Sequence, residues 1–197
     1  MERDWSSALR RLLTSRALLA VLIAIALVNV GVFAVQRWVV LPLSIPSPSM
    51  EPNLREGDRI LMRRSHDEVA DLRGRIDRGD VLVFRAPHTG RPLVVKRVIG
   101  LPGETIEAHD GIVAINNSRI LVEKWLPTSE REQGSSGARA VDIGYVRLRE
   151  DEVFVMGDNR DDSIDSRSFG PVKLSDVEGT VSLRIWPLGR FGTVDWS

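Results

Sequence analysis

A serine pair in a stiff segment is the first place in this sequence where covalent chemistry could occur. Ser47 and Ser49 lie in the run IPSPSMEP (45–52), where three prolines fix the backbone and remove amide donors. A regular strand would send the two hydroxyls to opposite sides, whereas a bend at proline could aim both at one carbonyl group. The segment therefore offers a candidate nucleophile, and the same composition would equally suit a Pro- and Ser-rich stalk.

Lys96 is the candidate base that could activate such a hydroxyl. It lies within LVVKRVIG (93–100), a run that predicts a strand, and the period of two puts it on one face with Val94 and Val98. Burial among apolar side chains would lower the pKa of the amine, and a neutral lysine can take a proton from a hydroxyl. The competing interpretation is a lysine on an edge strand whose charged end reaches water.

The other potential bases have less suitable surroundings. The three histidines, His66, His88 and His109, lie in polar turns, where no buried partner would fix the imidazole tautomer. Lys124 and Lys173 have polar or turn neighbours, and we expect both to be solvated. The chain has no cysteine, which excludes thiol catalysis, disulfides and cysteine-ligated zinc.

A polar segment near the C-terminus could support a catalytic site. The run GDNRDDSIDSRSFG (157–170) holds four aspartates, one asparagine and two arginines. This composition predicts a turn held by Asx bonds and carboxylate–guanidinium pairs. The run does not match an EF-hand calcium loop, because Arg160 interrupts the ligand alternation and the required glycine and glutamate are not at their positions.

Short apolar runs bounded by turn signals indicate the elements that must position these groups. Strands are expected at 59–62, 81–84, 93–100, 105–108, 112–115, 153–156 and 180–186. The dipeptide Asp110-Gly111 predicts a tight hairpin between two of them. This density of turns predicts a mainly β domain of antiparallel sheets, with no helix after residue 40 apart from a short turn around 67–74. The Gly- and Ser-rich stretch 129–139 is predicted to be a flexible loop.

The N-terminal part of the chain has a different character. Residues 17–35 contain no charged side chain, and a helix of this length would extend roughly 28 Å, close to the hydrocarbon thickness of a bilayer. Arginine is frequent just before this stretch. The charge asymmetry predicts a cytoplasmic N-terminal segment (1–16), a transmembrane helix (17–35) and an extracytoplasmic domain (36–197).

The apolar stretch has two other interpretations. A buried core helix would normally carry polar interruptions. A cleaved secretory signal finds some support in Val32-Phe33-Ala34, which loosely resembles a cleavage site, but the stretch is longer than the usual ~7–15 residues of such signals. The 27 basic and 27 acidic residues cancel in a chain of 197, which removes the electrostatic case for binding nucleic acid.

The order of these segments resembles that of bacterial type I signal peptidase, a membrane-bound Ser/Lys protease that removes signal peptides from exported preproteins. The resemblance rests on an N-terminal anchor followed by SPSM (47–50), RGDVLVF (78–84), KRVIGLPGE (96–104) and the 157–170 run. It covers the chain from about residue 17 to the mid-180s. The last two motifs are long and specific, so the match as a whole is not expected by chance.

The resemblance implies a role for each catalytic position. Ser49 corresponds to the nucleophile and Lys96 to the general base, and Lys at 96 rather than His is similar to the bacterial form. The hydroxyl of Ser47 corresponds to the group that joins the backbone N–H of Ser49 in the oxyanion hole. No metal or organic cofactor is implied.

The resemblance also implies supporting residues in the Asp-rich run. Ser163 corresponds to the serine that hydrogen-bonds and orients the lysine. Asp165 and Arg167 correspond to a pair that buttresses the site, and Asp158 lies in the same loop. Departures from the family pattern, which could affect substrate preference or loop packing, occur at Glu51, Asn53 and Ser168.

The family's properties are expectations for the rest of the molecule. The fold would be a signal-peptidase/SOS-repressor-like β domain behind one transmembrane helix, in the cell membrane. Its partners would be membrane phospholipids and secretory preproteins emerging from the translocation machinery, cut after small residues at Ala-X-Ala sites. A self-cleaving repressor-like Ser/Lys protease fits less well, because the chain has no Ala-Gly dipeptide. An inactive scaffold relative, or a plain β adaptor, would not account for Ser49 and Lys96 within matched motifs.

Overall fold

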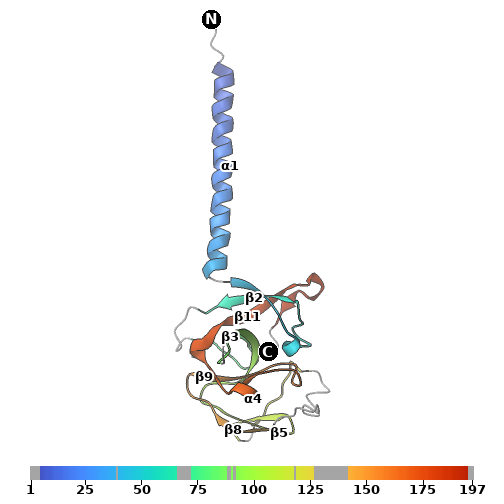
Figure 1. Ribbon diagram of the computed structural model, residues 1–197. Coiled ribbons are helices and arrows are strands. Elements are labelled where there is room, and N and C mark those ends of the chain that lie inside the picture. The colour runs from blue at the N-terminus through green and yellow to red at the C-terminus, as the bar shows by residue number, and fades with distance from the viewer. Residues whose placement is uncertain are drawn as a thin grey trace. The chain divides into compact units, whose positions relative to one another are not determined.

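The chain divides into two compact units, Met1–Val40 and Leu41–Ser197. The structure is a computed structural model that describes residues 5–38, 40–65, 72–87, 90, 92–117, 119–126 and 142–194 (Figure 1). The predicted flexible loop at 129–139 lies outside the described residues.

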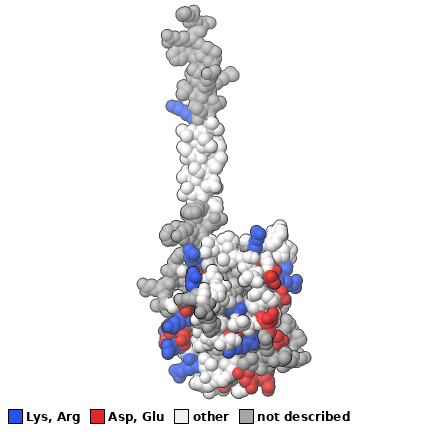
Figure 2. All heavy atoms as spheres, viewed as in Figure 1, with Lys and Arg blue, Asp and Glu red and all other residues white. Residues whose placement is uncertain are grey.

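The N-terminal unit contains one long helix, α1 (Trp5–Trp38). Its sequence has no proline and is rich in alanine and leucine, which favour helix. Its described apolar side chains are exposed, Leu27 at 66% among them, and Figure 2 shows this stretch free of charged residues. Within the part of the chain that the structure describes, no helix combines the length and hydropathy needed to cross a membrane.

The second unit is built on a large sheet with the strand order β1-β2-β11-β3-β4-β9-β10, and β12 pairs with β11. Its strands are β1 (Val40–Ser44), β2 (Arg59–Arg64), β3 (Val81–Arg85), β4 (Leu93–Gly100), β9 (Glu152–Met156), β10 (Val172–Lys173), β11 (Val177–Trp186) and β12 (Gly192–Thr193). Every pair whose register is described is antiparallel. The predicted antiparallel β domain is therefore confirmed.

A smaller sheet has the order β7-β6-β5-β8. It consists of β5 (Thr105–His109), β6 (Ile112–Ile115), β7 (Arg119–Ile120) and β8 (Ile143–Arg147). The predicted hairpin joins β5 to β6, and Asp110 and Gly111 take φ angles of 52° and 75° at its turn. Both angles are those of a tight primed turn, which aspartate and glycine tolerate best.

Strand β3 is covered by apolar side chains on both faces, which is why its run VLVF has no polar residue. Val81 and Val83 pack into one hydrophobic cluster, and Leu82 and Phe84 into another on the opposite face. Strand β4 lies beside it, between β3 and β9. Because both faces of these central strands are covered, β4 is buried from residue 96 to residue 100, and only its first residue, Leu93, is exposed.

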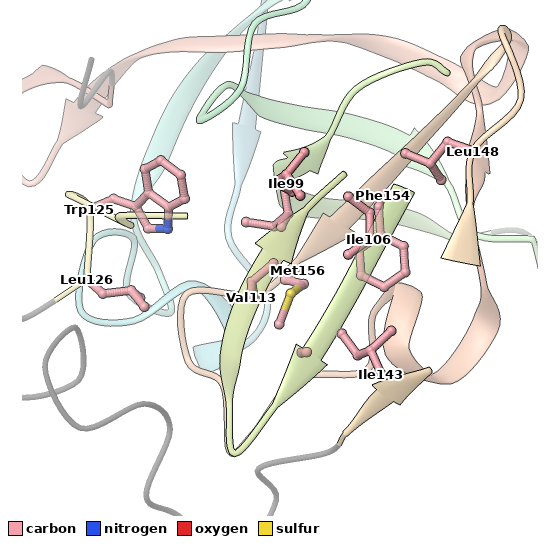
Figure 3. Packing of buried hydrophobic residues seen from close by; sticks show 11 residues of the cluster. Ile99, Ile106, Val113, Trp125, Leu126, Ile143, Leu148, Phe154 and Met156 are labelled. Atoms are coloured by element: carbon pink, nitrogen blue, oxygen red, sulfur yellow. The ribbon is translucent and has the colours of Figure 1, made fainter. Parts of the chain in front are cut away.

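A third cluster packs the small sheet against one end of β4 and β9. Ile99 and Phe154 of the large sheet meet Ile106 and Val113 of the small one, and all four are buried (Figure 3). Trp125, from the segment after β7, belongs to the same cluster. The packing fixes the small sheet and its connections beside the strand that carries Lys96.

The expectation of no helix after residue 40 is wrong at one place. Residues Ser166–Phe169 form a single helical turn, α4. The turn forms because the Asp165 carboxylate caps it and accepts the backbone N–H of Arg167 at 3.2 Å. Short 3-10 turns also occur at η1 (Pro48–Met50), η2 (Leu174–Asp176) and η3 (Leu188–Arg190).

Candidate active site

The serine pair lies where β1 leads into η1. Ser47 has extended backbone angles, Pro48 starts the 3-10 turn, and Ser49 falls inside it. This bend brings the two hydroxyls together, with Ser47 Oγ 3.2 Å from Ser49 Oγ. Ser49 is 8% exposed and Ser47 half-buried, so the segment forms a fixed wall of the site rather than a solvated stalk.

Lys96 lies opposite this turn on β4, in register with Leu82 of β3. The residue is 3% exposed, and its Nζ donates a hydrogen bond to Ser49 Oγ at 2.6 Å. The alternative of an edge-strand lysine that reaches water is wrong, because β4 is flanked by β3 and β9. The structure thus joins the candidate nucleophile and the candidate base directly.

The electrostatic surroundings favour a neutral amine at a pH where lysine is normally charged. Burial lowers the pKa of Lys96 from 10.5 to about 8, with Asp165 and Asp158 acting in the opposite direction and Arg167 assisting. At that pKa roughly a tenth of the amine is neutral at pH 7. Lys124 and Lys173, in contrast, are exposed as predicted.

The Asp-rich run (157–170) contacts the nucleophile turn. The backbone N–H of Asn159 donates to the Ser49 carbonyl at 3.1 Å, and the Asn159 side chain donates to the Pro48 carbonyl at 3.3 Å. Glycine is required at 157, since a Cβ there would clash with Ser163 Oγ and lie 2.5 Å from the Ser49 carbonyl oxygen. The loop therefore packs directly on the backbone of the nucleophile turn.

Asp165 and Arg167 form the predicted carboxylate–guanidinium pair. Arg167 Nε and Nη2 donate to the two carboxylate oxygens at 2.9 and 2.8 Å. Asp165 also accepts the backbone N–H of Gly157 at 2.9 Å. Burial raises the pKa of Asp165, but the Arg167 bonds and charge and the Gly157 N–H outweigh it, so the pKa is lowered and the carboxylate stays charged.

Asp158 pairs with Arg97, a residue that sequence reasoning did not single out. Arg97 Nε and Nη2 reach Asp158 at 2.8 and 2.7 Å, and both side chains are completely buried. Arg97 Nη1 donates to the Gly79 carbonyl at 2.6 Å. The strand pattern could have indicated this ion pair. It puts Arg97 on the face opposite Lys96, and a buried arginine needs a carboxylate partner.

Two further predicted positions have specific surroundings. Asn53, one of the departures from the family pattern, donates to the Asp158 carboxylate at 2.8 Å and to the Trp125 carbonyl at 2.9 Å. The predicted hydrogen bond between Ser163 and Lys96 is absent. Ser163 Oγ is buried against Gly157, and its hydroxyl acts on Asp165, whose pKa it helps to lower.

The remaining sequence candidates make no described side-chain contact with the dyad or lie outside the described residues. His109 is exposed at the end of β5, while His66 and His88 lie outside the described residues. Glu51 is half-buried and Ser168 exposed. The described groups that meet at one place are thus a hydroxyl pair, a buried amine and the aspartates that surround it.

The chain is similar to several known proteins. A family model described as signal peptidase, peptidase S26, matches residues 14–186. Signal peptidase I U of Bacillus subtilis (strain 168) is 33% identical over 171 residues, which cover 86% of this chain and 88% of that protein. Signal peptidase IB of Staphylococcus aureus (strain Mu50) is 31% identical over 184 residues, which cover 89% and 93%. A crystal structure of a signal peptidase I from Enterococcus faecalis V583 is 37% identical, covers 53% of this chain and 95% of that chain, and superposes with a TM-score of 0.46.

A match over this much of the chain establishes the class. The chain belongs to the signal peptidase family, peptidase S26. It is an enzyme of the signal peptidase I kind, a serine hydrolase whose family removes signal peptides.

Proposed function

We propose that this chain cuts signal peptides from secretory preproteins with Ser49 as nucleophile and neutral Lys96 as general base. The observation that carries the proposal is the 2.6 Å hydrogen bond from Lys96 Nζ to Ser49 Oγ in a buried setting. A base must reach the proton it removes within hydrogen-bond distance, and this pair does so. The lowered pKa of Lys96, about 8, supplies the neutral amine that the first step needs.

The first chemical step forms the acyl-enzyme. Lys96 takes the Ser49 hydroxyl proton as Oγ attacks the scissile carbonyl carbon, and the carbonyl oxygen becomes an oxyanion. The protonated Lys96 then gives its proton to the leaving amine as the C–N bond breaks. The mature protein departs, and the signal peptide stays bound to Ser49 as an ester.

The second step hydrolyses this ester. A water molecule gives a proton to neutral Lys96 and attacks the same carbonyl carbon. Collapse of the intermediate returns the proton to Ser49 Oγ and releases the signal peptide. In both steps the oxyanion would be held by the Ser49 backbone N–H and the Ser47 hydroxyl, and the 3.2 Å distance between the two serine oxygens supports this assignment.

The supporting residues act through position and charge. Asp165 with Arg167, and Asp158 with Arg97, are buried pairs around the amine. The aspartates raise the pKa of Lys96 and Arg167 lowers it, so together they keep the amine able both to accept and to return a proton. We infer a lysine-orienting role for Ser163 only from the family resemblance, since its hydroxyl makes no bond to the amine here.

Substrate would bind along the free edge of the large sheet. Strand β1 stands at one end of the strand order and runs directly into the serine turn. An extended preprotein segment can pair with such an edge through main-chain hydrogen bonds, which tolerate varied sequences. Small pockets next to Ser49 would then select small residues, as at Ala-X-Ala sites.

The N-terminal unit would hold the enzyme at the cell membrane. Residues 17–35 carry no charge, and the described apolar side chains of α1 are exposed. We infer one membrane crossing with the N-terminus in the cytoplasm and the catalytic domain outside, in contact with phospholipids and near the exit of the translocation machinery. This topology stays a prediction.

The test uses the full-length protein in detergent with a secretory preprotein. Wild type should generate a mature N-terminus just after a small residue, identified by mass spectrometry. Ser49→Ala and Lys96→Ala should abolish this product, and Lys173→Ala, an exposed lysine on β10, should not. Cleavage by the Ser49→Ala or the Lys96→Ala protein at a near-native rate would refute the proposed dyad.

A further inference from the structure

The segment from Glu123 to Leu126 belongs to none of the motifs that define the candidate site. It follows β7, and it ends where the described residues break off at 126. Three of its four side chains are nevertheless buried, namely Glu123, Trp125 and Leu126. Trp125 and Leu126 join the hydrophobic cluster between the two sheets (Figure 3). Glu123 is charged and buried beside them, so its carboxylate requires a partner.

Trp125 touches two of the residues that surround the dyad. The Arg97 guanidinium carbon lies 5.2 Å from the centre of its ring, within cation–π range. Its backbone carbonyl accepts the Asn53 side-chain amide at 2.9 Å, and the same amide donates to Asp158 at 2.8 Å. The segment is therefore attached to the strand of Lys96 through Arg97 and to the stretch after the nucleophile turn through Asn53.

Glu123 attaches the segment to the catalytic loop. Arg160 donates to both Glu123 carboxylate oxygens, through Nη1 at 2.8 Å and through Nη2. The Arg160 Nε donates to the Gly157 carbonyl at 3.0 Å. The Arg160 side chain is 3% exposed and the Glu123 side chain 8%. Arg160 thus fixes the backbone at Gly157 with a charge that only a buried carboxylate can balance.

We propose that Glu123 is a positioning residue for the Ser/Lys dyad. It acts through Arg160, which holds the Gly157 carbonyl and so sets where the Asp-rich loop lies against the Ser49 backbone and the Lys96 amine. This inference rests on the proposed function, because it assigns Glu123 to the same reaction. The loop has little freedom to adjust, since Gly157 already packs against the Ser49 carbonyl.

The surrounding charges predict how loss of the Glu123 charge would change the pKa of Lys96. Three charged groups act on Lys96: Asp165, Asp158 and Arg167. Besides Glu123, the groups that act on Arg160 are Asp158 and Asp165. Electrostatic potentials add, so loss of the glutamate charge leaves the Arg160 charge uncompensated and makes the potential around these aspartates and Lys96 more positive. The protonated amine is then less favoured, and its pKa falls further.

The experiment compares full-length variants on a synthetic peptide that contains an Ala-X-Ala site. Glu123→Gln removes the charge and keeps the shape. Arg160→Lys keeps the charge but loses the forked contact, so it serves where Glu123→Gln does not fold. Glu150→Gln is the matched control, because Glu150 pairs with Arg73 at an exposed site. Measurements are kcat, KM, the pH profile of kcat and the folded fraction at the assay temperature.

Positioning predicts a loss of up to about 100-fold in kcat for Glu123→Gln and Arg160→Lys, with KM little changed. The acid limb of kcat should move to lower pH in Glu123→Gln and stay in place in Arg160→Lys, and Glu123→Asp should recover part of the rate. Wild-type kcat in the folded variants would overturn the inference. So would a loss that equals the drop in folded fraction, because that marks a purely structural pair.

The proposed dyad fails in a distinguishable way. If Lys96→Ala retains activity, or if wild type has no acid limb near the lysine pKa, the Ser/Lys assignment is wrong. If wild type behaves as proposed and the Glu123 and Arg160 variants match it, only the positioning role is wrong.

Discussion

The amine of Lys96 donates a 2.6 Å hydrogen bond to the hydroxyl of Ser49, although the two residues are 47 positions apart in the chain. The contact depends on two different backbones. An interior strand of the sheet delivers the lysine to a buried position, and a proline-initiated 3-10 turn delivers the serine. The consequences of this contact can be measured in several ways.

The rate of cleavage should rise with pH through the pKa of Lys96. Only the neutral amine can accept the Ser49 proton, so below pH 8 the rate should fall about tenfold per pH unit. The check is kcat/KM for a signal-sequence peptide between pH 5.5 and about 9.5. A profile that instead breaks near pH 6.5, in the ordinary range of histidine, would contradict the lysine assignment.

The same pKa predicts a pH-dependent cost in stability. The unfolded amine titrates at 10.5 and the folded one at about 8, so between these values the unfolded state binds more protons and stability rises with pH. Below pH 8 both states are protonated, and the full cost of about 3 kcal/mol applies. Lys96→Met removes this term. The free energy of unfolding of Lys96→Met minus that of wild type should therefore decline as pH rises from about 8 to 10.5. Urea unfolding measures this difference. A difference that does not change with pH would count against burial as the cause of the lowered pKa.

Ser47→Ala should lower kcat by about 10²–10³ without unfolding the protein, because one oxyanion donor is lost. Ser47 is half-buried, and its described side-chain contact is with Ser49, so the substitution removes little packing. Ser168→Ala, at an exposed position of α4, is the matched control. Equal kcat values for the two variants would exclude the Ser47 hydroxyl from the oxyanion hole.

Gly157→Ala should inactivate the enzyme more than it destabilises the fold. The new Cβ would lie 2.5 Å from the Ser49 carbonyl oxygen, so either the loop or the nucleophile turn must move. We expect a loss of about 100-fold or more in kcat with a lowered Tm. Gly189→Ala has no heavy atom within 4 Å of its added Cβ and should leave both unchanged. Wild-type activity in Gly157→Ala would mean that this packing does not position Ser49.

Asp158→Asn should cost far more stability than a comparable change at the surface. It leaves the Arg97 charge buried without a carboxylate, and breaking such a pair typically costs about 3–5 kcal/mol. Glu178→Gln, whose partner Arg85 is exposed, should cost about 0–1 kcal/mol. Urea unfolding at pH 7 compares the two. Similar losses in both would contradict a fully buried Arg97–Asp158 pair.

Much of the architecture was readable from local pattern. Strands at 93–100 and 112–115 have the bounds that their apolar runs predicted, and Asp110-Gly111 formed the expected hairpin, because alternation and turn chemistry act over a few residues. Segments without such a signal were missed. The strand β8 lies in a run of mixed polarity, and α4 forms through one capping carboxylate.

The residues of the candidate site could be named from the sequence, but their relationships could not. Types and spacing singled out a serine pair, a lysine in an apolar strand and an Asp-rich run, because those patterns are local. Tertiary structure decided the burial of Lys96, since the flanking strands β3 and β9 place it inside the sheet rather than at an edge. It likewise decided that Arg97 pairs with Asp158 and that Glu123 pairs with Arg160, because a buried charge takes its partner from whatever segment the fold brings within reach.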